Sequence, residues 1–225
     1  MAGRMVSFPA NGGTTQGYLA APKGTGPGVI VLQEWWGLVP HIKTVCDRLA
    51  AEGFTALAPD LYHGKTTTSP DEAGRLMMAL HINQAAKDLK GAAACLLGHA
   101  ATGGKKKIGS MGFCMGGQLA LYAACENSQI GACVDFYGIH PNVKPNLAKL
   151  QAPVLGFFGE KDDFVTPDAV NKLEAELNKA GKHADFTTFP NVGHAFFNDA
   201  RPEAYHPDFA KKAWEKLLAF FRKTI

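Results

Sequence analysis

The sequence predicts an α/β fold in which helices cover both faces of a mainly parallel sheet with an antiparallel N-terminal edge. Continuous apolar runs, typical of strands buried on both faces, alternate with segments whose apolar residues have helical spacing. This alternation indicates a parallel sheet, because a helix carries the chain back across the sheet before each new strand. The chain opens differently, with two strand-like segments around Asn11-Gly12-Gly13, which predict an antiparallel hairpin.

The expected elements follow in order from this hairpin. Its strands take residues 5–9 and 16–20, and later strands are expected at residues 28–33, 54–59, 131–138, 152–159 and 184–189 and in the run that ends at Gly112. Helices are expected at residues 41–52, from 69 to about 99 in one or two pieces, after Cys114, from 166 to 181 and at 207–223. The sequence Ser69-Pro70-Asp71-Glu72 predicts a serine cap, a proline in the first turn and a glutamate three residues after the cap.

Composition and charge fit a single domain over residues 1–225 and exclude some function classes. Hydrophobic residues make up 46% of the 225 residues, which is enough for a large core. The net charge is only +3, and the one basic run, Lys105-Lys106-Lys107, is interpreted as a solvated loop, so we expect no nucleic-acid partner. No stretch reads as a membrane span or a signal peptide, and we therefore expect a cytoplasmic protein.

The cysteines indicate a reducing compartment and argue against structural disulfides and zinc. Their number is odd and no two have Cys-x-x-Cys spacing. The histidines lack the His-x-His and His-x-x-x-His spacings of metal sites, so we expect no metal. The five cysteines are Cys46, Cys95, Cys114, Cys125 and Cys133.

One stretch carries the strongest chemical signal. A strand-like run leads into Gly112-Phe113-Cys114-Met115-Gly116-Gly117, and helix-forming residues follow. This is the G-x-nucleophile-x-G pattern of a strained strand-to-helix turn, with cysteine where serine usually stands. The glycines let the strand and the helix approach each other. Cys114 would then lie at the positive end of the helix, which favours a thiolate and any developing anion.

The polar residues that follow the strands predict a Cys-Asp-His triad. In a parallel sheet, functional residues gather at the carboxyl ends of the strands. Cys114, Asp162 and His194 each follow a predicted strand, in the order nucleophile, acid and histidine of α/β-hydrolases. His194 would withdraw the thiol proton and later activate water, while Asp162 would orient the imidazole. Asp163 is the alternative acid, but Gly159-Glu160-Lys161-Asp162 matches the usual Gly-x-x-Asp turn, so we choose Asp162.

Two backbone N–H groups are expected to form an oxyanion hole beside the nucleophile. Met115 directly follows Cys114, and Trp35 lies in the loop after the strand at residues 28–33. Donors of this kind stabilise the transition state by about 3 kcal/mol each. The predicted site therefore supports acyl transfer to the thiol.

Together these motifs resemble the dienelactone hydrolase family. The elbow, Asp162 and four further motifs occur in the family's order over almost the whole chain. The four are Gln33-Glu34-Trp35-Trp36-Gly37-Leu38, Ala58-Pro59-Asp60-Leu61-Tyr62, Tyr137-Gly138 and Gly193-His194-Ala195-Phe196. The resemblance implies a cytoplasmic hydrolase of α/β-hydrolase fold that needs no cofactor and cleaves a small ester or lactone through an acyl-thioester. We expect a monomer or a homodimer.

The resemblance also implies a role for Glu34. In the family the corresponding glutamate contacts the region of the nucleophile and helps to control ionisation of the thiol. Its physical basis is that a carboxylate near a thiol raises the free energy of the thiolate unless the carboxylate turns away. We therefore include Glu34 among the expected catalytic residues.

The substrate is expected to be uncharged. Family members that cleave dienelactone hold the substrate carboxylate with two arginines. One of them lies four residues after the triad histidine, where this chain has Asn198, and the other is expected near Pro70. Arg75 and Arg201 lie close by in sequence and are the alternatives that could take their place, but both are interpreted as solvated surface residues. Without a bidentate guanidinium clamp, an anionic substrate is disfavoured, so we predict a neutral ester or lactone.

Residues that flank the catalytic loops are expected to line the substrate pocket. They are Trp36, Phe196, Phe197 and Asn198. For Trp36 and Phe197, packing in the core is the alternative. Two other functions stay open: the same triad acting on a phosphotriester or a thioester, or a non-catalytic binding or redox-sensing protein that uses Cys114 as an oxidisable thiol. The complete triad favours catalysis.

Overall fold

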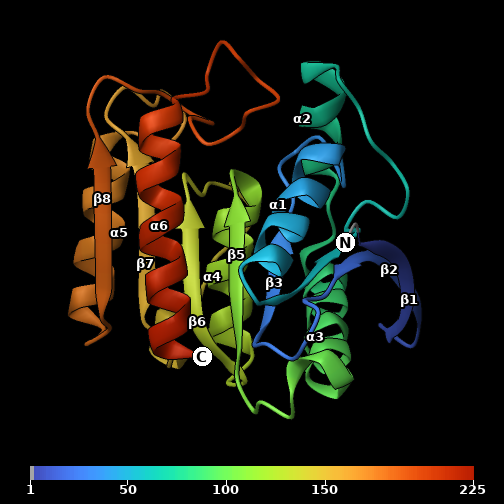
Figure 1. The fold of residues 1–225 in the computed structure, drawn as a ribbon. Helices are drawn as coiled ribbons and strands as arrows, with labels where there is room; N and C mark the ends of the chain where they lie inside the picture. The colour runs from blue at the N-terminus through green and yellow to red at the C-terminus, as the bar shows by residue number, and fades with distance from the viewer. Residues whose placement is uncertain (1–2) are drawn as a thin grey trace.

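In the computed structural model, which describes residues 3–225, eight strands form one sheet in the order β1-β2-β4-β3-β5-β6-β7-β8 (Figure 1). β2 pairs antiparallel with both β1 and β4, and all other pairings are parallel. The predicted mainly parallel sheet with an antiparallel N-terminal edge is thereby confirmed. The strands are β1 (Arg4–Ala10), β2 (Gly13–Ala20), β3 (Gly28–Leu32), β4 (Thr55–Pro59), β5 (Ile108–Phe113), β6 (Ile130–Phe136), β7 (Val154–Gly159) and β8 (Ala184–Phe189).

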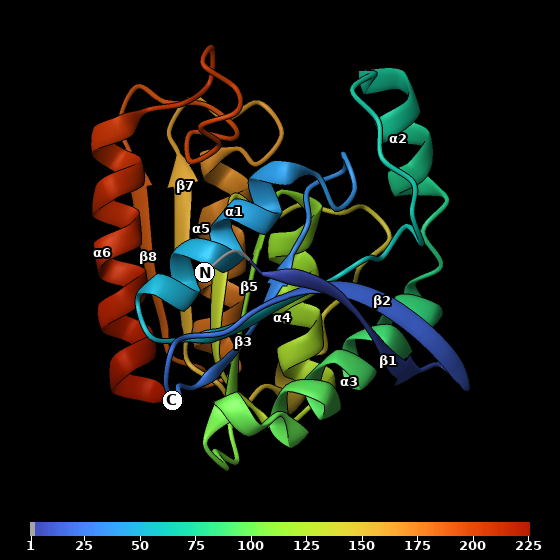
Figure 2. The same cartoon turned by 45° about the vertical axis from the view of Figure 1, so that its right-hand side comes forward.

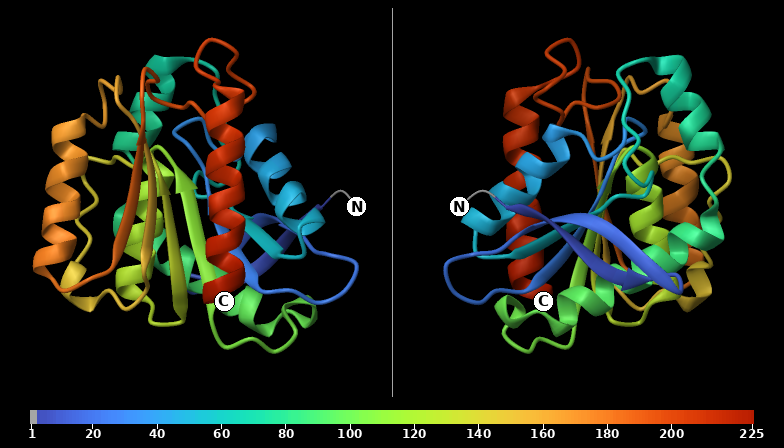
Figure 3. Two further views of the ribbon diagram at one scale, coloured as in Figure 1. Left: turned by 60° about the vertical axis from the view of Figure 1, so that its left-hand side comes forward. Right: turned by 90° about the vertical axis from the view of Figure 1, so that its right-hand side faces the viewer.

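Helices cover both faces of this sheet. α1 and α6 pack on one face, and α3, α4 and α5 pack on the other (Figure 3). The helices are α1 (Pro40–Ala51), α2 (Pro70–Met78), α3 (Ile82–Gly98), α4 (Met115–Glu126), α5 (Pro167–Lys179) and α6 (Pro207–Thr224), with short 3-10 turns η1 (Ala100–Thr102) and η2 (Leu147–Lys149).

β3 shows why the buried strands have continuous apolar sequences. Val29 and Val31 face the core that lies under α1 and α6. Ile30 and Leu32 point to the opposite core, which contains residues of α3 and α4. Successive side chains of a strand alternate between the two faces, so a strand covered on both sides needs apolar residues at every position.

The opening hairpin turns at the predicted residues. Asn11 and Gly12 both have positive φ, 53° and 75°, and Ala10 pairs with Gly13 across the two-residue loop. Two positive φ angles match the primed turn whose twist suits a hairpin, and asparagine followed by glycine adopts it most readily. Figure 2 shows β1 and β2 as a twisted ribbon at the edge of the sheet, beside α3.

The predicted helix starts are confirmed in position but not in every side-chain contact. Thr166 Oγ1 accepts a hydrogen bond of 3.3 Å from the Ala169 N–H and caps α5. Ser69 precedes α2 as its N-cap residue, but its side chain makes no capping bond. Glu72 instead pairs with Arg75, N to O 2.7 Å, on the exposed face of α2. The expected capping box is therefore wrong, because Glu72 finds a charged partner one turn further along the helix.

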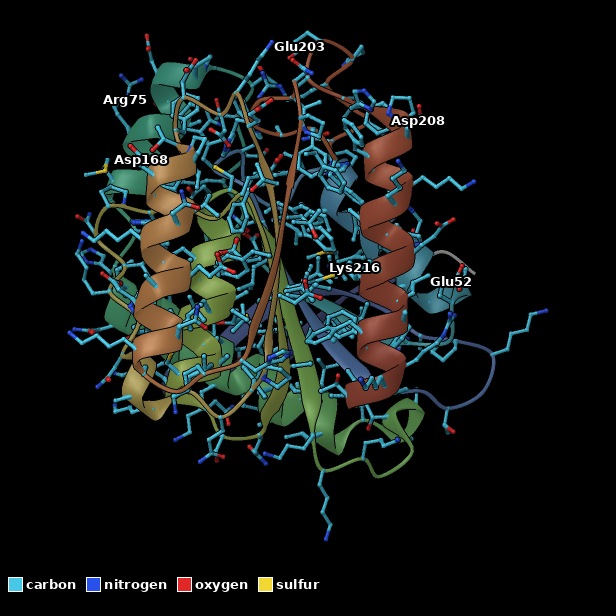
Figure 4. The ribbon with its side chains drawn as sticks, turned by 90° about the vertical axis from the view of Figure 1, so that its left-hand side faces the viewer. Glu52, Arg75, Asp168, Glu203, Asp208 and Lys216 are labelled. Carbon is cyan, nitrogen blue, oxygen red and sulfur yellow. The ribbon has the colours of Figure 1, made fainter. Side chains whose placement is uncertain are left out.

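The fold gathers its irregular segments at the carboxyl ends of the parallel strands. α2 and the long loop between β8 and α6 both stand at this end of the molecule (Figure 1). Figure 4 shows the same end, with Arg75 of α2 and Glu203 of the long loop. Among residues 3–225, no helix combines the length and apolar character needed to cross a bilayer.

Candidate active site

Cys114 lies in a sharp turn between β5 and α4. Its φ and ψ are 54° and −125°, a strained conformation for a residue with a side chain. A Cβ atom added to Gly112 would collide with the carbonyl oxygen of Gly116, and one added to Gly116 would lie 2.5 Å from the Leu32 carbonyl oxygen. The strand and the helix therefore cross at a distance that only glycine permits, as the elbow pattern predicts.

The main chain of Cys114 is fixed by the turn that follows β6. Its N–H donates to the Phe136 carbonyl at 3.0 Å, and its own carbonyl accepts from the Ile139 N–H at 3.1 Å. Between them, Tyr137 has a φ of 42° and donates its N–H to the Phe157 carbonyl of β7 at 2.8 Å. Three neighbouring strands thus hold the elbow in place, and only 8% of Cys114 is exposed.

A buried carboxylate supports this turn. Asp135, the residue before Phe136, is 1% exposed, and its carboxyl lies against the backbone of Gly138. Its Oδ1 has no hydrogen-bond partner among the residues that the structure describes. Burial raises the pKa of Asp135 to about 7, although the backbone N–H of Gly138 partly opposes the shift. The folded protein therefore favours the protonated carboxyl over the carboxylate below about pH 7.

Replacing Asp135 with asparagine is expected to flatten the dependence of stability on pH. A carboxyl whose pKa is raised by folding contributes stability at low pH that is lost as the pH rises through the folded pKa. The parent should therefore lose roughly 3 kcal/mol of unfolding free energy between about pH 5 and about pH 8, which Asp135→Asn does not lose. Urea unfolding at both pH values measures this difference. The exposed Asp163→Asn is the control, and parallel pH profiles for parent and Asp135→Asn would contradict the expectation.

Asp162 and His194 form a close pair at the ends of neighbouring strands. His194 Nδ1 lies 2.7 Å from Asp162 Oδ2, and the Asp162 side chain is fully buried. Asp162 Oδ1 accepts from the backbone N–H groups of Phe164 and Val165 at 2.8 and 2.9 Å. These bonds fix the carboxylate while it holds the ring. The neighbouring Asp163 is exposed, so the structure pairs the histidine with the acid chosen from the sequence.

The protonated form of His194 is stabilised by its surroundings. Burial on its own lowers the pKa of this imidazole, but hydrogen bonds and charge from Asp162 and Cys114 outweigh burial and raise the pKa to about 10. The ring also lies between two aromatic side chains, with centroids 4.9 Å from Tyr137 and 5.2 Å from Phe164. Together these contacts favour an imidazolium facing the sulfur.

The site residues surround a cavity of about 430 Å³ at the carboxyl ends of the strands. Cys114 and His194 line it, as do Glu34, Trp35 and Trp36 from the loop after β3. The remaining lining residues are Pro70, Met77, Ile139, Phe164, Ala195 and Arg201. The cavity therefore joins the predicted nucleophile, its histidine and the loop expected to carry the second oxyanion donor.

Glu34 is a buried carboxylate with one polar partner. It is 1% exposed, and its Oε2 accepts a hydrogen bond of 2.7 Å from the Asn198 side-chain amide. Burial raises the pKa of Glu34, whereas His41, His194 and the bond from Asn198 act in the opposite direction. Burial therefore favours the protonated form of Glu34, while the neighbouring histidines and Asn198 favour its carboxylate.

The two residues expected to form the oxyanion hole are Met115, which directly follows Cys114, and Trp35, which lines the same cavity as Cys114. Met115 is the first residue of α4, where a backbone N–H has no partner within the helix. Trp35 is half-buried, and its indole ring packs edge-on against Trp36 with centroids 5.0 Å apart. Their role in binding an oxyanion stays a prediction.

Two of the expected pocket residues lie elsewhere. Phe196 and Phe197 are fully buried in the core and do not line the cavity. Phe196 packs edge-on against Tyr137, and Phe197 stacks on Phe113 at 5.3 Å. The prediction was wrong for both, because the chain turns down into the core after Ala195, whose φ is 64°.

Asn198 was also expected in the pocket, but it does not line the cavity that contains Cys114. It is 2% exposed, and its side-chain amide donates to Glu34. At the position where an arginine was the alternative, this chain therefore has an amide that binds one of its own carboxylates. Trp36, by contrast, lies at the cavity as expected.

Sequence reasoning missed three residues at the site. Tyr137 and Phe164 flank the His194 ring, and Arg201, interpreted as a surface residue, lines the cavity. Tyr137 carried a usable signal, since it directly follows the carboxyl end of β6. Phe164 and Arg201 lie in irregular loops, where no periodicity indicates which way a side chain points. Arg75 is exposed and does not reach the cavity, as expected.

Comparisons with known proteins agree with this geometry. Residues 15–225 match the model of the dienelactone hydrolase family. "Protein usf" of Aquifex pyrophilus is 40% identical, and a "Putative carboxymethylenebutenolidase" of Aquifex aeolicus is 37% identical, each alignment covering 99% of both chains. The crystal structure of a "Putative Dienelactone Hydrolase" from Klebsiella pneumoniae superposes with a TM-score of 0.88 at 33% identity and covers 98% of both chains. The chain therefore has the α/β-hydrolase fold and belongs to the dienelactone hydrolase family.

Proposed function

We propose that this protein hydrolyses carboxylic esters or lactones with Cys114 as nucleophile and an acyl-thioester as intermediate. The observation that carries the proposal is the 2.7 Å pair of Asp162 and His194, whose ring shares a cavity with the Cys114 sulfur. Membership of the family and the name of the Aquifex aeolicus relative support ester hydrolysis. Asp162 is the proposed orienting acid.

Acylation begins with a thiolate and an imidazolium. The environment that raises the pKa of His194 favours transfer of the thiol proton to this ring. The thiolate attacks the ester carbonyl, and the carbonyl oxygen becomes an oxyanion bound by the N–H groups of Met115 and Trp35. When the tetrahedral intermediate collapses, the bond to the leaving oxygen breaks and His194 gives that oxygen its proton.

Deacylation reverses the roles of the same groups. The neutral His194 accepts a proton from water while the water oxygen attacks the thioester carbonyl. Collapse of the second tetrahedral intermediate releases the acid and restores the Cys114 thiolate beside the imidazolium. Asp162 holds Nδ1 throughout, so that Nε2 of the ring is left for the proton transfers.

Glu34 is proposed to influence ionisation of the thiol. Its carboxylate lines the same cavity as the sulfur, where a negative charge raises the free energy of the thiolate. The amide of Asn198 binds Oε2 and favours the ionised carboxylate in a fixed position. A change at Asn198 would therefore act on the nucleophile through Glu34.

We propose that residues 1–225 form one domain, since all eight strands join one sheet with a core on each face. A cytoplasmic location, a monomer or homodimer and activity without a cofactor stay predictions. They follow from the resemblance and from the cysteine pattern rather than from the site.

A neutral ester is expected to be the better substrate, which also tests the proposed activity. Asn198 replaces an arginine, and the one guanidinium at the cavity, Arg201, already bonds to Glu203 at 2.8 Å. We expect kcat/KM for 4-nitrophenyl butyrate to exceed that for cis-dienelactone by about tenfold or more, as expected for a site without a free cation. Parallel turnover assays measure the ratio. Preference for dienelactone would reject the neutral substrate, and hydrolysis of neither compound would reject the proposed activity.

A further inference from the structure

A cavity of about 300 Å³ lies where α2 leads into α3, apart from the proposed active site (Figure 2). Its walls come from the loop after β4, from the C-terminal end of α2 and from the first two turns of α3. No residue that lines it also lines the cavity that contains Cys114. A ligand bound here would therefore occupy a site of its own.

One face of α3 points into this cavity. Gln84, Ala85 and Asp88 line it, and so does His81 at the start of the helix. Residues three, four and seven positions apart lie on the same side of a helix. Asp88 therefore belongs to the cavity face of α3, one turn after Gln84.

Asp88 is a buried carboxylate whose two oxygens point to different neighbours. The residue is 1% exposed, and Oδ1 accepts a hydrogen bond of 3.0 Å from Thr15 Oγ1 of β2. Oδ2 points instead to His63, whose side chain lines the cavity and is 57% exposed. Oδ2 lies 3.4 Å from His63 Nε2 and has no hydrogen-bond partner among residues 3–225. Oδ2 is thus on the cavity side of the carboxylate, behind a ring that solvent reaches.

The charge of this carboxylate is poorly compensated from within the protein. A buried carboxylate needs a positive charge or several donors, because its burial otherwise costs several kcal/mol. Thr15 supplies one neutral hydroxyl, and His63 brings a charge only when it is protonated. Lys65 also lines the cavity, but in the described part of the chain it forms no ion pair with Asp88. A bound cation with N–H groups would supply both the charge and the missing donor.

The rest of the cavity suits a short apolar chain. Leu76 and Leu80 contribute apolar surface, and Tyr62 forms a fixed part of the wall. The Tyr62 N–H donates to Asp60 Oδ1 at 3.1 Å, and the Tyr62 hydroxyl donates to Met115 Sδ at 3.2 Å. Because this side chain is held at both ends, the wall is formed before a ligand arrives, which lowers the free-energy cost of binding.

We infer that this cavity binds a small organic cation, a primary ammonium group on a short apolar chain. The ammonium lies at Asp88 Oδ2, where it takes the place of the exposed His63 ring, and the chain lies against the leucines. Hydrogen bonds between an ammonium and a carboxylate are about twice as strong as neutral ones, so the charged group fixes the ligand. This site is additional to the proposed ester hydrolysis and does not depend on it.

The test compares two probes that have the same chain and differ in charge, n-pentylammonium and 1-pentanol. An aliphatic amine is protonated at pH 7. Titration of the ¹⁵N-labelled protein, followed by NMR, gives the Kd and the place of binding. We expect n-pentylammonium to bind about tenfold or more tightly than 1-pentanol and to shift the amide signals of residues 61–65 and 79–88.

Two variants change the cavity in different ways. Asp88→Asn keeps the shape of the side chain and the acceptor for Thr15 but removes the charge. It should weaken n-pentylammonium about tenfold and leave 1-pentanol unchanged. Gln84→Trp fills the cavity from an exposed position and should weaken both probes about tenfold. Asp71→Asn removes an exposed carboxylate of α2 that does not line the cavity, and this matched control should bind both probes as the parent does.

The inference is overturned if n-pentylammonium does not bind, binds no more tightly than 1-pentanol, or shifts only signals from other parts of the chain. It is also overturned if Asp88→Asn, shown by its NMR spectrum to be folded, binds n-pentylammonium as tightly as the parent. Should Asp88→Asn not fold, Gln84→Trp decides, since an unchanged affinity in that variant would place the ligand outside this cavity.

Discussion

Replacing Cys114 with alanine is expected to lower kcat/KM for 4-nitrophenyl butyrate by about ten-thousandfold. The thiol is the only group at the cavity that can form the proposed acyl intermediate, and loss of a triad nucleophile costs most of the rate enhancement of such a site. Oxyanion donors and substrate binding would account for the activity that remains. Steady-state kinetics measures the loss, and intact-protein mass spectrometry of the quenched parent should show an acyl adduct on Cys114.

The control for this variant is Cys95→Ala, which removes a half-buried thiol of α3 that does not line the cavity. It should retain the parent activity and the adduct. If Cys114→Ala hydrolysed the ester as fast as the parent, another nucleophile would be required. If the parent were inactive while Cys114 oxidised readily, the redox-sensing alternative would take the place of the hydrolase.

Replacing Asp162 with asparagine is expected to lower kcat/KM by about a thousandfold or more. The amide keeps the shape of the carboxylate but provides no charge to stabilise the imidazolium, and it permits the wrong tautomer of His194. The pKa of His194 should fall, because the charge and the 2.7 Å bond of Asp162 are among the causes that raise it. The alkaline limb of the profile of kcat/KM against pH, where the imidazolium is lost, should then move to lower pH.

Asp163→Asn makes the same chemical change one residue away. Asp163 is exposed, so its variant should match the parent in rate and in pH profile. Equal losses in the two variants would indicate a general effect on the loop rather than orientation of the ring. If Asp162→Asn lowered kcat/KM at every pH but left the alkaline limb of its pH profile unshifted, the proposed pairing of Asp162 with the imidazolium would be contradicted.

Much of the fold and the core of the site could be predicted because the signals are local or follow from topology. The glycines around Cys114 indicate a close approach of two backbone segments, and Asn11-Gly12 indicates two positive φ angles. Each of these signals consists of a few adjacent residues. Asp162 and His194 lie 32 residues apart, but each lies in the loop that follows a strand. Parallel strands end at one edge, so position relative to a strand was sufficient to bring the two together.

The remaining features depend on packing between segments that carry no periodic signal. Phe197 and Arg201 belong to the same irregular loop, yet one is buried against Phe113 and the other lines the cavity. Asn198 is 164 residues from its partner Glu34. The capping bonds expected at Ser69 and Glu72 are absent for a related reason. Glu72 could bind either a backbone N–H at the start of α2 or the guanidinium of Arg75, and it binds Arg75. Which of two possible contacts a side chain makes depends on the three-dimensional arrangement of its neighbours, and the order of residues in the sequence does not show that arrangement.

The hydrogen bonds that hold the elbow come from main-chain groups of Phe136 and Ile139, not from side chains. The backbone conformation at position 114 therefore does not depend on whether the side chain ends in sulfur or oxygen. An exchange of cysteine for serine would alter the reacting atom and its acidity while the scaffold stayed as it is. In this architecture a change between thiol and alcohol chemistry needs a single substitution at the nucleophile, followed by retuning of its acid–base partners.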